Sequence, residues 1–192
     1  MVRTAPAARR DGIGLGSQPF VLTATIPEPV RGWAEGLRCA HFPPERNHLH
    51  AHVTLFHAFA PSLREELLSF LPQVVAEFAP PEGRITGLLD FGKGTAIRLE
   101  APELRSLRGL IAEHFHGSLT EQDLHDPRPH ITIQNKVTKE EARALQAELR
   151  PQLDPWIDRG TFKFPALELH LYQGGPWEKL RDFSFRGGAR PV

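Results

Sequence analysis

The feature that most constrains the fold of this chain is a tetrapeptide pattern that occurs twice. His52-Val-Thr-Leu55 and His130-Ile-Thr-Ile133 share the pattern His-x-Thr-apolar at an offset of 78 positions. Leucines on the segments that follow align at the same offset: Leu67 with Leu145, and Leu71 with Leu149. Each of those segments has a helical pattern and leads to a strand, a Gly-rich turn and another strand. The chain therefore contains an internal duplication of a whole structural unit.

The hydrophobic periodicity predicts strands and helices in a repeated order. Strands are predicted at 20–26, 48–57, 84–91, 95–99, 129–134, 161–164, 166–172 and 180–185, and helices at 28–38, 61–78, 102–116 and 138–149. This order predicts an α+β fold with two pseudo-symmetric lobes. Each lobe is expected to hold an antiparallel sheet with helices on its outer face, with an active-site groove between the lobes. By the duplication, the strand at 166–172 is assigned to the second lobe.

The length of the chain fits one domain. Residues 19–186 are expected to form a single bilobal domain, between a disordered leader (1–18) and a tail (187–192). The leader lacks the apolar segment of a secretory signal, although its arginines also fit a short mitochondrial presequence. No apolar run approaches the roughly 18 residues of a membrane span. With a single cysteine, the sequence suggests a cytoplasmic protein, and a monomer is expected.

The charge balance narrows the class of partner. Lys plus Arg equals Asp plus Glu, at 23 each, so the formal net charge is zero. Binding to long nucleic acid usually needs a basic excess that releases counterions. The charge balance therefore favours a small substrate or a nucleic-acid end over duplex nucleic acid, and no membrane partner is expected.

Strand periodicity divides the histidine-rich segment HLHAHVTLFH (48–57) into two faces. Side chains two residues apart point the same way, so His48, His50, His52 and Thr54 share one polar face. His57 is out of step and is predicted on the opposite, apolar face. The second copy presents an equivalent polar set: Arg128, His130, Thr132 and Gln134. If the two units pack together, two imidazoles and two hydroxyls line one groove.

Such a groove suits acid–base chemistry at phosphorus. Opening a phosphodiester needs a base for the attacking hydroxyl or water and an acid for the departing oxygen, and histidine titrates near neutrality. Thr54 and Thr132 can donate to phosphate oxygens. Arg128 adds a candidate charged contact to phosphate. His50 and Tyr172 are further candidate substrate contacts, whereas Trp177 and Phe183 are predicted to pack in the core.

At these motifs the sequence resembles the 2H phosphoesterase superfamily, which includes 2'-5' RNA ligase-like and RNA 2',3'-cyclic phosphodiesterase proteins. The resemblance spans about Phe20 to Phe185 and includes Arg128-Pro129 before the second motif. It implies a metal-independent phosphodiesterase without a cofactor, acting on 2',3'-cyclic phosphate or 2'-5' bonds of nucleotides or RNA ends. It also implies that His52 and His130 are the acid and base and that Thr54 and Thr132 bind phosphate. The additional His48 and His50 depart from the family pattern.

Two other functions remain open from the sequence. A zinc-dependent hydrolase could use His48, His50 and His52, since zinc accepts three histidine ligands. Same-face strand residues lie about 6.6 Å apart, however, so three in a row do not converge readily on one ion. A non-catalytic nucleotide or RNA-end binding module could use the same scaffold.

Overall fold

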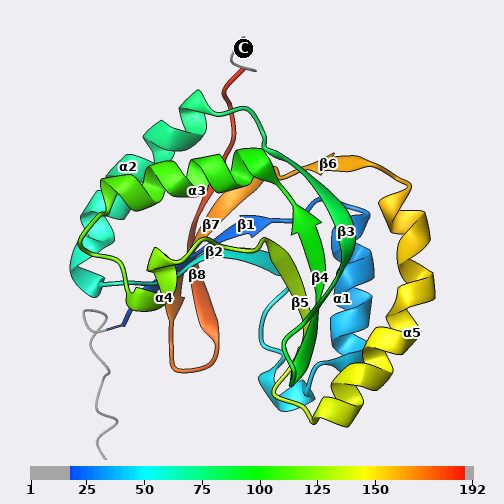
Figure 1. The fold of residues 1–192 in the computed structure, drawn as a ribbon. Helices are drawn as coiled ribbons and strands as arrows, with labels where there is room; N and C mark the ends of the chain where they lie inside the picture. The colour runs from blue at the N-terminus through cyan, green and yellow to red at the C-terminus, as the bar shows by residue number, and fades with distance from the viewer. Residues whose placement is uncertain (1–17, 189–192) are drawn as a thin grey trace, which may run out of the picture.

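The structure is a computed structural model that describes residues 18–188, so nearly all of the predicted leader and most of the predicted tail lie outside the described residues. The described chain folds into strands, α-helices and two short 3-10 turns (Figure 1). The strands are β1 (Phe20–Thr25), β2 (His52–Phe59), β3 (Glu82–Asp90), β4 (Gly94–Glu100), β5 (His130–Asn135), β6 (Thr161–Lys163), β7 (Ala166–Tyr172) and β8 (Trp177–Ser184). The helices are α1 (Val30–His41), α2 (Arg64–Glu77), α3 (Pro102–His114), α4 (Glu121–Leu124) and α5 (Lys139–Ile157), with η1 (Pro44–Arg46) and η2 (Pro61–Leu63).

The strands form two antiparallel sheets of four, as the duplication predicts. Sheet A has the order β2-β1-β7-β8, and sheet B has the order β5-β4-β3-β6. One motif strand lies at the edge of each sheet, and each pairs with one neighbour, β2 with β1 and β5 with β4. The α+β fold with two pseudo-symmetric lobes is therefore confirmed.

The two repeats exchange their third strands. After β2 and α2 the chain crosses to sheet B, where β3 pairs with β4. After β5, α5 and β6 it returns to sheet A, where β7 pairs with β1. The assignment of strand 166–172 to the second lobe was therefore wrong, because similar order along the chain does not say which sheet a strand joins. In space the counterpart of β4 is β1, not β8.

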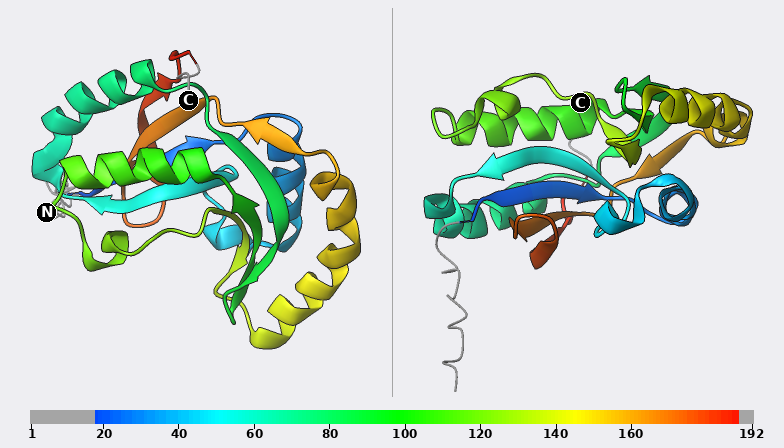
Figure 2. Two further views of the ribbon diagram at one scale, coloured as in Figure 1. Left: turned by 45° about the horizontal axis from the view of Figure 1, so that its top comes forward. Right: turned by 90° about the horizontal axis from the view of Figure 1, so that it is seen from below.

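The helices also exchange between the repeats and form one pair per lobe (Figures 1 and 2). Helices α1 and α5 lie together over sheet B, where α1 contacts β5 and α5 contacts β3 and β4. Trp33 of α1 stacks on Trp156 of α5 with ring centroids 4.5 Å apart. On the other lobe α2 contacts β8, and Phe70 of α2 stacks on His114 of α3 at 3.7 Å. Each outer layer thus combines a helix from each repeat.

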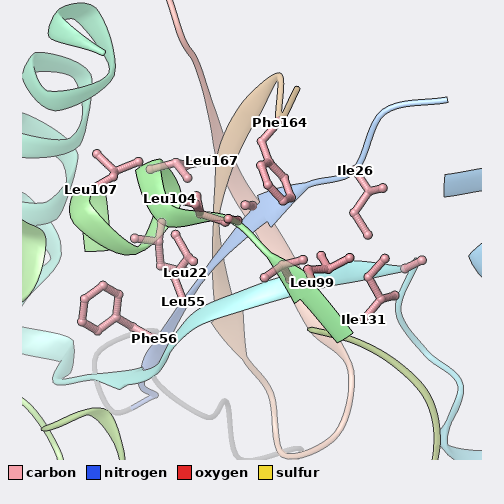
Figure 3. Packing of buried hydrophobic residues seen from close by; sticks show 14 of the residues in the cluster. Leu22, Ile26, Leu55, Phe56, Leu99, Leu104, Leu107, Ile131, Phe164 and Leu167 are labelled. Carbon is pink, nitrogen blue, oxygen red and sulfur yellow. The ribbon is translucent and has the colours of Figure 1, made fainter. Parts of the chain in front are cut away.

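One hydrophobic core extends across both sheets (Figure 3). Leu22, Leu55 and Leu167 of sheet A meet Leu104 of α3. The cluster continues into sheet B through side chains such as Ile131, and all five are at most 4% exposed. Burying a leucine side chain contributes roughly 1.5–3 kcal/mol. The faces opposite this core are left for the polar residues of the motifs.

Local sequence signals fix several element boundaries. The Thr138 hydroxyl accepts from the Glu141 amide at 3.2 Å, and the Glu141 carboxylate accepts from the Thr138 amide at 2.8 Å, so the predicted capping box begins α5. The hairpin β3–β4 turns at Gly92, which has a φ of +75°. Among the helices of residues 18–188, none has the length and apolar character needed to cross a membrane.

Candidate active site

The motif strands β2 and β5 lie in contact where the two sheets meet (Figure 1). Val53 and Ile131 at the centres of the motifs are fully buried, whereas the flanking histidines and threonines are half-buried. The alternation places the motif histidine and threonine of each strand on the face opposite the core. The structure therefore brings together two strand segments of the same composition, one from each repeat.

His52 and His130 make the same hydrogen bond. Nδ1 of His52 donates to the His50 carbonyl at 2.7 Å, and Nδ1 of His130 donates to the Arg128 carbonyl at 2.6 Å. A carbonyl oxygen can only accept, so Nδ1 carries the proton in both neutral rings. Nε2 of each ring is consequently left with a lone pair that can take a proton.

An aromatic ring packs beside each of these histidines. Trp177 at the start of β8 lies 5.1 Å from the His52 ring, and Phe91 after β3 lies 5.1 Å from the His130 ring. The core position predicted for Trp177 was wrong, because the exchanged β7–β8 hairpin carries it to the polar face of sheet A. Phe183 is 4% exposed, and its predicted core position is confirmed. Sequence reasoning missed Phe91, although its place just after the third strand of a repeat resembles that of Trp177 before β8.

The surroundings of His52 oppose its protonation. Burial lowers the pKa of His52 from 6.5 to about 4, while its hydrogen bond to the His50 carbonyl acts in the opposite direction. The positive charges of Arg38 and His170 lower this pKa further, and Glu168 raises it. His52 is therefore neutral at pH 7 in the ligand-free protein.

Burial likewise lowers the pKa of His130, against the effect of its hydrogen bond to the Arg128 carbonyl. The nearby charges of His57 and Arg128 act in the same direction as burial. Both motif histidines are thus neutral imidazoles at pH 7, each with a free Nε2.

The low pKa of His52 predicts acid sensitivity of the fold. The unfolded chain takes up this proton more readily than the folded one, so the free energy of unfolding falls as pH drops from 6.5 towards 4. We expect His52 to account for a loss of about 2 kcal/mol between about pH 7 and about pH 4.5. Urea unfolding at both pH values measures this loss, which should shrink in His52→Gln and persist in His116→Gln, at an exposed position. An equal loss in wild type and His52→Gln would contradict the assignment.

The other predicted phosphate ligands lie beside the histidines. Thr54 and Thr132 share the faces of His52 and His130, and within residues 18–188 neither hydroxyl has a protein hydrogen-bond partner. Arg128 is exposed, and its guanidinium makes no ion pair with the described part of the chain. Both hydroxyls and the guanidinium thus retain their capacity to bind an anion.

The three histidines of the possible zinc site have different surroundings. His50 is 92% exposed, and its Nδ1 lies 3.1 Å from Oε1 of Glu35 on α1. The other Glu35 oxygen accepts from the Ala51 amide at 2.6 Å, which fixes the chain just before His52. His48 lies in the lining of a cavity to which His50 and His52 do not contribute. Across residues 18–188, no three histidine, cysteine or acidic side chains come together as a metal site.

A bulge in β2 changes the place of His57. The partner of Leu22 is Phe56 and that of Thr23 is Thr54, so the register gains one residue, and Leu55 and Phe56 are both buried. The prediction that His57 lies on the apolar face of the strand is therefore wrong. Its side chain is 46% exposed, and Nδ1 lies 2.9 Å from Oδ1 of Asp123.

A cavity of about 470 Å³ opens beside the motifs, between residues of both repeats. Its lining comes from the segment before β2, the end of β5 and the β7–β8 turn: Phe42, Glu45, Arg46, His48, Asn135, Lys136, Tyr172, Gly174 and Gly175. Tyr172 is 38% exposed, and its backbone pairs with Trp177, whose ring packs on His52. The volume lies in the range of small-molecule sites.

Comparison with protein families gives one match. The sequence profile described as the 2'-5' RNA ligase superfamily matches residues 26–176. The match begins after β1 and ends just before β8, and it includes both motifs. No curated protein sequence matches the chain.

Solved structures share the fold at low sequence identity. TT0787 of Thermus thermophilus is 20% identical with a TM-score of 0.56, and LigT of E. coli complexed with NADP+ is 17% identical with a TM-score of 0.58. LigT of E. coli complexed with 3'-AMP is 16% identical with a TM-score of 0.53. Each match covers 88% of this chain and 98% of the other chain. At this identity the likeness establishes the fold.

Proposed function

Because the chain belongs to the 2'-5' RNA ligase superfamily, we propose that it is a phosphodiesterase with two-histidine acid–base catalysis. Its substrates would be 2',3'-cyclic phosphates or 2'-5' phosphodiester bonds of nucleotides or RNA ends. The observation that carries the proposal is the matched pair of imidazoles, His52 and His130, each with Nδ1 held by a carbonyl and Nε2 free. One such group suits a binding site or a structural role. Two, on contacting strands, supply both a base and an acid.

For a cyclic phosphate the proposed step is a hydrolysis. Nε2 of one histidine takes a proton from water, whose oxygen bonds to phosphorus. The bond from phosphorus to one ribose oxygen breaks, and Nε2 of the other histidine donates a proton to that oxygen. The product is a phosphomonoester, and the two imidazoles have exchanged protonation states. The step requires no metal or cofactor, because both proton transfers use side chains of the chain itself.

Because both pKa values are low, the substrate must bring the negative charge that favours protonation of one histidine. Both imidazoles are neutral before binding, whereas the acid must carry a proton on Nε2. A phosphate anion beside the rings raises their pKa, so one histidine takes up a proton as substrate binds. Thr54, Thr132 and Arg128 would hold the same anion through hydroxyl and guanidinium donors.

The cavity beside the motifs supports a nucleotide substrate. Tyr172 offers a ring on which a base can stack, and Arg46 and Lys136 in the same lining can attract phosphate. His48 lies in this lining, and His50 is exposed two residues before His52. Of the two candidate substrate contacts, His50 and Tyr172, Tyr172 is the better supported because it lines the cavity and His50 does not. In this arrangement the cavity binds the nucleoside and the motifs bind the phosphorus centre.

The proposal is tested with a panel of 2',3'-cyclic nucleotides and short 2'-5' and 3'-5' oligonucleotides, each with and without EDTA. We expect turnover of a cyclic phosphate or a 2'-5' bond at equal rates in both conditions. We expect Tyr172→Ala to raise KM for that substrate about tenfold with little change in kcat, because stacking contributes about 1–3 kcal/mol per base. Binding without turnover across the whole panel would instead support a non-catalytic module.

A further inference from the structure

Two buried arginines occupy equivalent places in the two repeats. Arg38 lies on α1, between β1 and the first motif strand, and is 3% exposed. Arg108 lies on α3, between β4 and the second motif strand, and is 7% exposed. Burial lowers the pKa of both guanidinium groups, which shows that the surroundings oppose their charge. Taking such a charge out of water costs several kcal/mol unless hydrogen bonds offset it.

Arg38 connects the two motifs through backbone oxygens. Its Nη1 donates to the carbonyl of Thr132, inside the second motif, at 2.7 Å. Its Nη2 donates to Oδ1 of Asn47 at 2.9 Å and to the carbonyl of Leu49 at 3.0 Å, just before His52. The planar guanidinium of Arg38 thus holds the segment that leads into the first motif close to the backbone of the second motif.

Arg108 makes the reciprocal connection. Its Nε donates to the carbonyl of Leu55, the last residue of the first motif, at 3.3 Å. Its Nη2 donates to the carbonyl of Asp123, on the segment that leads to the second motif. Each arginine therefore reaches from the helix of its own repeat to a motif carbonyl of the other.

We propose that Arg38 and Arg108 are positioning residues that hold the two motif strands in the register required for the paired proton transfers. This inference rests on the proposed function. Strands β2 and β5 lie in different sheets and form no ladder with each other, so the backbone pairing of sheets A and B does not set their offset. The two guanidinium bridges supply that missing connection. A misplacement of about 1 Å can lower a reaction rate roughly 100-fold.

The two arginines differ in their electrostatic effect on the motif histidines. The charge of Arg38 lowers the pKa of His52, together with His170 and against Glu168, while Trp177 packs on the ring without charge. The charges that act on His130 are those of His57 and Arg128. Arg38 thus combines positioning with an electrostatic effect, and Arg108 provides positioning alone.

The test compares Arg38→Met, Arg38→Lys, Arg108→Met and Arg108→Lys with two surface controls, Arg31→Met on α1 and Arg105→Met on α3. Both control arginines form exposed ion pairs. In folded protein we expect each Met substitution to lower kcat about 10- to 100-fold with less than a threefold change in KM. Lysine keeps the charge but not the planar fork of donors, so its variants should recover only part of kcat. The controls should match the wild type.

Histidine NMR titrations separate positioning from general loss of stability. Arg38→Met should raise the pKa of His52 and move the His130 resonances, because the Thr132 carbonyl loses its donor. Arg38→Lys should leave the pKa of His52 near its wild-type value, and Arg108→Met should do the same. A kcat equal to wild type in folded Met variants overturns the proposal. So does a loss that only follows thermal stability and is shared by the controls.

Failure of the proposed function would look different. Wild-type protein would then turn over no substrate of the panel, whereas failure of the arginine inference leaves an active wild type and active variants. If the wild type is inactive, the histidine NMR titrations still test the inference about the two arginines. Unchanged His130 resonances in Arg38→Met would show that the bridge positions nothing.

Discussion

Replacing His52 or His130 by alanine is expected to lower kcat at least 100-fold in each variant, on the substrate that the wild type turns over in EDTA. Each replacement removes one of the two proposed proton-transfer groups, and such a group typically contributes 10²- to 10⁴-fold. The two losses should not multiply in the double variant, because a base without its acid completes few reactions. Steady-state rates at saturating substrate measure the effect.

His116→Ala is the matched control, since His116 is exposed in the turn that follows α3 and belongs to neither motif. Its rate should equal that of the wild type. Complete dependence on added zinc, with full activity in His130→Ala, would overturn the two-histidine mechanism and favour a metal site at His48, His50 and His52.

Replacing Asp123 by alanine is expected to lower the free energy of unfolding by about 3 kcal/mol. Asp123 is 1% exposed, and its carboxylate accepts from the His57 and Ala58 amides at 2.9–3.0 Å and from the Thr120 hydroxyl at 3.2 Å. His57 Nδ1 completes the set at 2.9 Å. Removing the carboxylate leaves these donors unpaired beside the bulge of β2. Urea unfolding at neutral pH measures the loss.

Asp126→Ala is the control for Asp123, because Asp126 is 71% exposed and its ion pair with Arg105 lies on the surface. It should cost less than about 1 kcal/mol. Burial raises the pKa of Asp123, but hydrogen bonds from His57 and Ala58 outweigh this and lower it below 3.8. The stability that the Asp123 carboxylate contributes is therefore complete well above pH 3.8, and it is lost as the pH falls through the lowered pKa of Asp123. Equal losses in the two variants would contradict the role of Asp123.

The duplicated motif predicted much of the fold and placed the candidate histidines on the correct face. Periodicity of two is enough to separate His52 and Thr54 from Val53, because the core face must be apolar. The same reasoning failed at His57, since the residue inserted in the bulge between Thr54 and Phe56 reverses the faces of the side chains that directly follow it. Helix α4, which carries Asp123, has four residues and too short a pattern to be predicted.

Other errors came from contacts between segments far apart in the chain. The hydrophobic pattern of 166–172 predicts a strand, but its partner depends on the crossing of the chain between the sheets. Because Trp177 follows that strand in the chain, it lies beside the His52 ring and not in the core as predicted. The roles proposed for Arg38 and Arg108 were likewise not predictable from the sequence, because their partners are backbone carbonyls, which every residue type carries.

The exchange of third strands has a consequence for how the protein folds during synthesis. Val21 of β1 pairs with His170 of β7, so the interior of sheet A joins the two ends of the domain. A ribosome that has made β1, β2 and α2 has produced only two strands of that sheet. Folding dominated by such distant pairs is slow, because loop-closure entropy is lost before the contacts form. We expect the nascent chain to reach its native state only after β8 has left the ribosome, with the unpaired edge of β1 exposed to chaperones until then.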